Sequence, residues 1–195
     1  MKINDEYWNS ERDVFSNRGV VLFQDEHLPE LNDCKSILDL GCGTGILVDK
    51  LNSKGIDCHG ITYSKLEVEK SKNKNVHYGD MHNIPFDNNL FDGFIMWDSL
   101  EHCQSAYIAL CEAKRILKDN GKGLIFMPGQ NWLNCGCHIC CYTPPQMEQL
   151  FRQSGFLLES TFEKAYADDK NCDCYGMAVY VVQKIAEYKA TFARK

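Results

Sequence analysis

The 195-residue chain lacks several features that would mark a membrane or nucleic-acid-binding protein. No apolar run approaches the ~18 residues of a membrane-spanning helix, and residues 1–6 lack the apolar core of a secretory signal, so we expect a cytoplasmic protein without membrane insertion. The net charge is −6 and no basic block is present, which argues against nucleic acid as a partner. The sequence also has no internal repeat and no low-complexity segment, and its length fits a single domain.

What is present, above all, is a glycine-rich turn between an apolar strand and a helix. Residues 38–45 read LDLGCGTG, and the apolar residues before the turn are typical of a buried strand. The glycines Gly41, Gly43 and Gly45 allow the backbone to turn sharply and to approach a ligand closely. Residues 46–51 have helical spacing, and Gly55 marks the end of that helix. This order is typical of the first unit of a nucleotide-binding α/β fold.

The details of this turn favour a ligand without phosphate. The dinucleotide fingerprint is G-x-G-x-x-G, whereas the spacing here is G-x-G-x-G. Asp39 lies at the strand end, where its carboxylate would repel a pyrophosphate but attract a cation or a hydroxyl. S-adenosylmethionine (AdoMet) has a sulfonium, an ammonium and a ribose, and it fits this turn better than a dinucleotide does.

The remaining chain alternates strands with helices. Helix starts are indicated by Ser64 with Glu67, which form a predicted capping box, and by Thr143 with Gln146. A helix is also predicted over 106–117, and further strands over 56–62, 76–78, 94–97, 123–127, 156–162 and 177–182. This pattern predicts a Rossmann-like, doubly wound α/β fold with a seven-stranded, mostly parallel sheet, an antiparallel edge strand and helices on both faces.

Four blocks in a fixed order give the chain a specific resemblance. They are LDLGCGTG (38–45), GITYS (60–64), GDMHNIPFDNNLFDGFIMWDSLEH (79–102) and ILKDNGKGLIFMP (116–128). Together they resemble the class I AdoMet-dependent methyltransferases, in the type-11/type-23-like branch that acts on small molecules. The resemblance covers about residues 36–184 and implies a single domain over 1–195. In that domain, 1–35 form a helical lead-in and lid, and 36–184 form the AdoMet-binding core.

The resemblance implies a cofactor site at the carboxyl ends of the first four strands. The turn would hold the amino-acid and sulfonium portion of AdoMet, Thr62 would replace the usual acidic residue at the ribose, and Asp80 would accept a hydrogen bond from the adenine amino group. Tyr63 would pack on the adenine or ribose edge, and Trp97 would face the position where the methyl group leaves. Losing the ribose carboxylate lowers affinity by about 1–3 kcal/mol if nothing replaces it. The implied cofactor-binding residues are Asp39, Gly41, Cys42, Gly43, Gly45, Thr62, Tyr63, Asp80, Met81 and Trp97.

The sequence is less informative about the residues that would bind the methyl acceptor. His102 is a candidate general base because an imidazole titrates near neutrality; alternatively, Glu101 and His102 brace the following loop. Tyr7 and Trp8 resemble the aromatic lid of the family, although they also suit plain core packing. The candidate acceptor-binding residues are Tyr7, Trp8, Asp98, His102 and His138.

Eleven cysteines are the anomaly of the composition, and six of them are clustered. The clusters follow the fifth strand and separate the last two strands, so we expect both at the carboxyl edge of the sheet. Their thiols, with His138, suit zinc or another thiophilic metal, but they also suit a soft substrate or simple buried or redox-paired cysteines. The six are Cys135, Cys137, Cys140, Cys141, Cys172 and Cys174.

The sequence therefore predicts an AdoMet-dependent methyltransferase for an O, N or C nucleophile of a small molecule. The alternative is a catalytically weak methyltransferase-like scaffold that binds a metal or a partner through its cysteine-rich loops. We expect a monomer or a homodimer.

Overall fold

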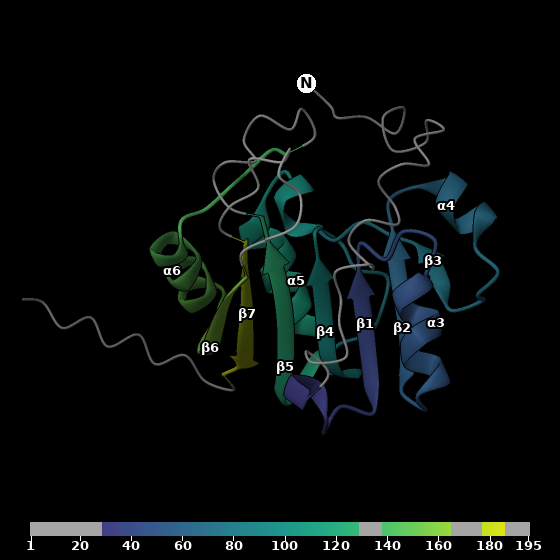
Figure 1. The fold of residues 1–195 in the computed structure, drawn as a ribbon, viewed down its shortest axis with the longest axis horizontal. Coiled ribbons are helices and arrows are strands. Elements are labelled where there is room, and N and C mark those ends of the chain that lie inside the picture. Colours follow the sequence, from purple (N-terminus) through teal and green to yellow (C-terminus); the bar gives the residue numbers. More distant parts are fainter. Residues whose placement is uncertain (1–28, 129–137, 165–176, 186–195) are drawn as a thin grey trace, which may run out of the picture.

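The computed structural model describes residues 29–128, 138–164 and 177–185, which form one mixed sheet with helices packed against it (Figure 1). The strand order is β3-β2-β1-β4-β5-β7-β6. The strands are β1 Ser36–Leu40, β2 Asp57–Thr62, β3 Val76–Tyr78, β4 Phe91–Trp97, β5 Leu117–Met127, β6 Phe156–Lys164 and β7 Met177–Lys184. The helices are α3 Ile46–Ser53, α4 Lys65–Lys70, the 3-10 turn η2 Leu100–His102, α5 Ala106–Ile116 and α6 Pro144–Ser154.

The pairing confirms the predicted seven-stranded, mostly parallel sheet. Strands β3, β2, β1, β4 and β5 pair in parallel, while β7 pairs antiparallel with both β5 and β6. The antiparallel strand β7 thus lies between β5 and the edge strand β6, which runs in the same direction as β5. The carboxyl ends of six strands therefore share one edge of the sheet, where ligands bind in open α/β folds.

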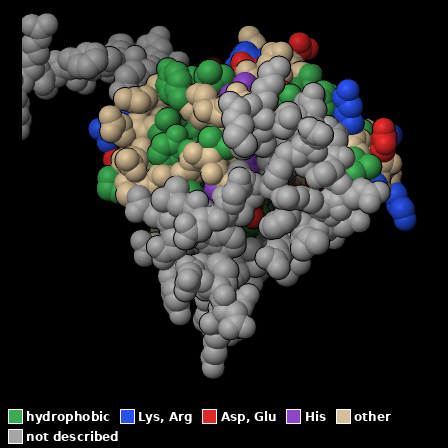
Figure 2. All heavy atoms as spheres, turned by 90° about the horizontal axis from the view of Figure 1, so that it is seen from above, with side chains coloured by type: hydrophobic (Ala, Val, Ile, Leu, Met, Phe, Trp, Pro, Cys, Tyr) green, Lys and Arg blue, Asp and Glu red, His purple; other side chains and the backbone are tan. Residues whose placement is uncertain are grey.

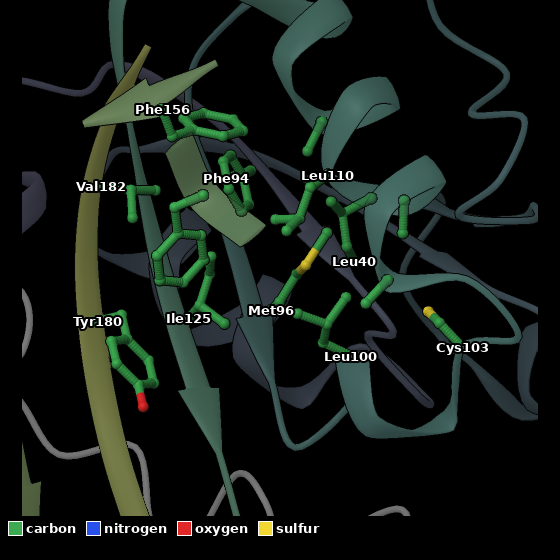
Figure 3. Packing of buried hydrophobic residues seen from close by; sticks show 14 of the residues in the cluster. Leu40, Phe94, Met96, Leu100, Cys103, Leu110, Ile125, Phe156, Tyr180 and Val182 are labelled. Atoms are coloured by element: carbon green, nitrogen blue, oxygen red, sulfur yellow. The ribbon is translucent and has the colours of Figure 1, made fainter. Parts of the chain in front are cut away.

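Successive residues of the central strands alternate between two apolar layers. Leu38 and Leu40 of β1 face one layer, and Ile37 faces the other. The first layer includes the buried face of α5, with Leu110 against Leu40 and Met96 of the sheet (Figure 3), and that of α6. The second layer includes α3. Burial of each large apolar side chain contributes roughly 1.5–3 kcal/mol. No helix in the described ranges is long and apolar enough to cross a membrane.

Strands β4 and β5 begin earlier than the sequence predicts, at Phe91 and Leu117. These two residues pair with each other. In each strand, polar residues separate this first residue from the apolar run, so the sequence pattern alone does not predict the early start. One of these polar residues, Asp92 of β4, has a structural role. Its carboxylate accepts hydrogen bonds from the backbone of Lys35 and from the backbone and side chain of Ser36, at 3.0–3.1 Å.

The helix boundaries follow the predicted caps with one exception. Thr143 and Gln146 form the complete capping box of α6, and Gly155 ends that helix at φ +85°. At α4, Ser64 caps the backbone N–H of Glu67 as predicted, but the Glu67 carboxylate does not return to the cap. It bonds Thr62 instead, so the predicted capping box is only half formed.

Candidate active site

The glycine turn after β1 is held tightly by its neighbours. The backbone N–H groups of Gly41 and Cys42 both donate to the carbonyl of Ile61, at 2.9 and 3.0 Å. Gly41, Gly43 and Gly45 all have positive φ, of 90°, 55° and 88°. A Cβ atom added to Gly41 would lie 2.5 Å from the Cβ of Ser99, so only glycine fits this close approach.

Asp39 is buried directly beneath this turn. Only 3% of the residue is exposed, and burial raises the pKa of its carboxyl to about 7. Burial, with Asp39 as a secondary cause, also raises the pKa of the nearby Cys42 and Cys58 thiols. A buried carboxyl whose charge is disfavoured in this way gains from a cationic ligand.

Glu67 of α4 places a carboxylate at the end of β2, where the sequence predicted no acidic residue. The hydroxyl of Thr62 donates to Oε2 of Glu67 at 2.5 Å, and Thr62 also accepts from the backbone N–H of Ser64. Burial raises the pKa of Glu67, while the Thr62 hydrogen bond acts in the opposite direction. Glu67 is an acidic residue shortly after β2 in the sequence, but its spacing from Ser64 also fits a helix cap, and that is the role predicted for it.

Tyr63, the next residue, stacks on Tyr78 at the end of β3, with ring centroids 5.6 Å apart. Tyr63 as a whole is 38% exposed. The predicted contact of Tyr63 with adenine or ribose stays a prediction.

The residues after β3 form a fixed hydrogen-bonded chain. Oδ1 of Asp80 accepts from the backbone N–H of His82 at 2.8 Å and lies 2.7 Å from Nδ1 of the same histidine. The backbone N–H of Ser105 donates to Nε2 of His82, which assigns the proton to Nδ1. This chain fixes Asp80 relative to the start of α5. Its neighbour Met81 lies beside the glycine turn, with Cε 3.8 Å from a Cβ added to Gly41.

The end of β4 lies on the other side of the turn. The hydroxyl of Ser99 donates to the carbonyl of Leu40, and Asp98 has a positive φ of 53°. Trp97 is 6% exposed and stacks on Phe126, with ring centroids 4.4 Å apart. The structure thus places Trp97 in the second apolar layer, and its predicted role at the transferred methyl group stays a prediction.

Beyond β4, Glu101 lies close to two histidines. Its side chain is fully buried, and Oε1 lies 3.8 Å from Nε2 of His102. The rings of His102 and His138 meet edge to face, with centroids 5.0 Å apart. Burial raises the pKa of Glu101 well above its usual value, and the neighbouring Asp98 carboxyl raises it further. Backbone N–H groups of Ile139 and Cys140 donate to the Glu101 carbonyl and hold the 138–141 segment against η2.

The described cysteines are mostly buried, as expected for the scattered ones. Cys34, Cys42, Cys58 and Cys103 are buried, and Cys111 is half-buried. Cys140 of the first cluster lies with Sγ 3.6–3.9 Å from three carbonyl oxygens of the η2 region, and burial raises the pKa of its thiol to about 11. Its thiol is therefore placed as a weak hydrogen-bond donor.

The structure brings together the predicted site residues that lie at the carboxyl ends of β1, β2, β3 and β4. Figure 2 looks onto this edge from above and shows histidine side chains at the surface among hydrophobic ones. His138, Cys140 and Cys141 lie at the same edge beside η2. Outside the described residues lie the predicted lid residues Tyr7 and Trp8 and the cysteines Cys135, Cys137, Cys172 and Cys174.

Comparison with known proteins shows which family and fold this chain resembles. Residues 38–125 match the family described as a methyltransferase domain. Demethylmenaquinone methyltransferase of Staphylococcus haemolyticus is 36% identical over 95 residues, which are 43% of this chain and 39% of that protein. The chain spans less than two fifths of the length of the curated relatives that it matches.

Solved structures share the fold at low sequence identity. A chain from the complex between the Haloferax volcanii Trm112 methyltransferase activator and a methyltransferase has a TM-score of 0.73 at 18% identity, covering 93% of this chain and 99% of that one. The Burkholderia thailandensis 1,6-didemethyltoxoflavin-N1-methyltransferase, with bound 1,6-didemethyltoxoflavin and S-adenosylhomocysteine, has a TM-score of 0.67 at 15% identity, covering 88% and 79%. The match of residues 38–125 to the methyltransferase-domain family, together with the shared fold, supports a class I methyltransferase of the type-11 kind.

Proposed function

We propose that this protein is a methyltransferase that uses AdoMet and transfers its methyl group to an O, N or C nucleophile of a small molecule. The observation that carries the proposal is the glycine turn, with buried Asp39 beneath it and the Glu67 carboxylate at the next strand end. The structural relative from Burkholderia thailandensis has S-adenosylhomocysteine bound, which supports the same cofactor for this fold.

The turn suits the charged part of AdoMet. A buried carboxyl with a raised pKa disfavours a phosphate and favours an ammonium or sulfonium, because a cation offsets the penalty of its own negative charge. The turn is held in place, because Gly41 packs closely against Ser99 and the N–H groups of Gly41 and Cys42 bond the Ile61 carbonyl. In this proposal Asp39 is the electrostatic partner of the cofactor's cationic portion.

The ribose would be held by Glu67, presented by Thr62. The usual acid at the end of the second strand is absent, but Glu67 is brought by α4 to within 2.5 Å of the Thr62 hydroxyl. Hydrogen bonds to a charged group contribute roughly 1.5–3 kcal/mol. Glu67 therefore supplies the carboxylate whose loss the sequence analysis anticipated.

Asp80 and Met81 are proposed to hold the adenine. Asp80 is oriented by His82, and its side chain is 45% exposed, so it is accessible to a ligand amino group. Met81 reaches the edge of the glycine turn and the thiol of Cys103. The adenine would thus lie between the end of β3 and the start of α5.

A small acceptor is favoured by the charge of the chain. The net charge of −6 disfavours a polyanionic substrate. Methyl transfer from an activated sulfonium needs mainly alignment and exclusion of water, effects worth up to ~7–11 kcal/mol in well-oriented systems. Asp98 and His102, which follow β4, are the described side chains proposed to line the acceptor side.

A thermal-shift measurement with AdoMet tests this proposal. At a hundredfold excess over the dissociation constant, binding stabilises the native state by about 2.7 kcal/mol, equivalent to a rise in Tm of about 5–10 °C for a chain of this length. Asp80→Asn should reduce the rise, whereas Asp87→Asn, at an exposed position of the following loop, should leave it unchanged.

The two possible failures are distinct. No rise in Tm of the wild type would contradict AdoMet binding and favour the inactive-scaffold alternative. A wild-type rise that Asp80→Asn leaves intact would contradict only the placement of the adenine.

A further inference from the structure

We propose that Glu101, His102 and His138 form a binding site for a divalent transition metal, separate from the cofactor site. One ligand atom from each of the three residues lies within 4.8 Å of the others. Two imidazoles and one carboxylate are a common ligand set for zinc and for other first-row divalent metals.

The strongest indication is the state of Glu101. Its side chain is fully buried, neither carboxylate oxygen accepts a hydrogen bond from an N–H or hydroxyl group of the described residues, and the neighbouring Asp98 side chain adds a second carboxyl. A buried carboxylate without such partners is strongly destabilising unless a cation compensates it. The same Glu101 carboxylate supplies one ligand atom to the set that it forms with His102 and His138.

The three residues come from two segments that the backbone locks together. Glu101 and His102 are consecutive in η2, whereas His138 follows β5 and lies next to Ile139. The N–H of Ile139 donates to the Glu101 carbonyl at 2.8 Å, and that of Cys140 donates to the same carbonyl at 3.2 Å. These main-chain hydrogen bonds therefore hold His138 next to Glu101 and His102.

The spacing requires only a small contraction. Zinc binds nitrogen and carboxylate oxygen at about 2.0–2.2 Å, so tetrahedral ligands lie about 3.4 Å apart. The ligand atoms here lie within 4.8 Å of one another, so no pair has to close by more than about 1.4 Å. The Glu101–His102 pair already lies at 3.8 Å. Three protein ligands leave a fourth coordination position for water or for an oxygen or nitrogen of the acceptor.

This ligand set differs from the cysteine clusters that the sequence suggested. Cys140 directs its sulfur toward the carbonyl oxygens of Leu100, Glu101 and Cys103, at 3.6–3.9 Å. The inference does not depend on AdoMet, since the proposed metal ligands exclude every residue assigned to the cofactor.

Metal titration of the full chain tests the inference without measuring methyl transfer. Chelator-treated protein should bind about one zinc ion per chain, detected by competition with a chromophoric chelator. Cobalt(II) at the same site should give visible d–d bands without the intense near-ultraviolet charge transfer of a thiolate ligand. The cobalt spectrum of the wild type is informative even if a variant fails to fold.

Matched variants assign the ligands. Glu101→Gln keeps the shape of the side chain and should weaken zinc binding roughly tenfold or more, as should His138→Gln. Glu69→Gln on α4 and His77→Gln on β3 remove the same groups away from the site and should bind zinc like the wild type. The inference is overturned if the wild type binds no zinc, if thiolate charge transfer accompanies binding, or if Glu101→Gln and His138→Gln bind normally.

Discussion

At the residue scale, the buried Asp39 carboxyl links the chemistry of the site to the stability of the fold. Burial raises its pKa to about 7, whereas the unfolded chain titrates near the ordinary value of 3.8. The folded protein therefore holds a proton between these values that the unfolded chain has released. Stability from this group is present below pH ~4 and is lost as the pH rises to ~7.

Replacing Asp39 by Asn should remove this pH dependence. At about 1.4 kcal/mol per pKa unit, the wild type should lose up to ~4 kcal/mol relative to Asp39→Asn between pH 4 and 7, with no further difference above that range. Urea unfolding of both proteins across this range measures the effect. Asp57→Asn, at an exposed position of β2, should follow the wild type. Parallel profiles of wild type and Asp39→Asn would contradict the raised pKa.

Individual contacts of the site were only partly predictable from the sequence. The glycines and Asp39 are local to one motif, so their placement followed from the strand–turn–helix pattern. Glu67 was visible as a capping residue, but its bond to Thr62 depends on where α4 begins relative to β2. The Glu67 side chain could either cap α4 or bond Thr62, and the spacing in the sequence is compatible with both.

At the element scale, Arg115 of α5 fixes the loop between β3 and β4. Its guanidinium donates to the carbonyls of Ile84 and Phe86 and to both carboxylate oxygens of Glu112, each at 2.8 Å. Glu112 in turn accepts from the backbone N–H of Ile84. The loop that follows Asp80 is thus bound to the helix by a planar, multidentate group that lysine cannot replace.

Arg115→Lys should therefore destabilise the fold, by about 2 kcal/mol, since several charge-assisted bonds are lost together. The matched control is Arg152→Lys on α6, where the side chain is 63% exposed and pairs with Glu148. That exchange should change stability by roughly 0.5 kcal/mol or less. Chemical denaturation compares the two variants, and equal losses of stability would show that the Arg115 network is not special.

Elements with apolar periodicity and clear caps were predictable, and polar stretches were not. The α6 cap appears in the sequence as Thr143, two prolines and Gln146, and the structure confirms it. The first residues of β5 look like a loop because they are charged, yet Leu117 pairs with Phe91 across the sheet. Such segments become strands because they pair with a strand that is distant in the sequence, and this pairing produces no local sequence pattern.

At the scale of the whole molecule, alternation of strands and helices was sufficient to predict the sheet. Parallel order then places the ends of β1, β2, β3 and β4 at one edge, which is why residues from separate motifs meet there. Sequence reasoning did not foresee that Glu101 and His138 would share a site. Their meeting depends on backbone bonds between η2 and the segment after β5.

We propose that this edge of the sheet binds AdoMet with the Glu67 carboxylate in place of the missing acidic residue at the end of β2. The most direct test is calorimetric titration of AdoMet into the wild type, Glu67→Gln and Glu69→Gln. We predict saturable binding to the wild type and to Glu69→Gln, with Glu67→Gln weaker by roughly 10- to 100-fold, since a charge-assisted bond contributes about 1.5–3 kcal/mol. Absence of wild-type binding, or equal affinity of all three proteins, would contradict the account.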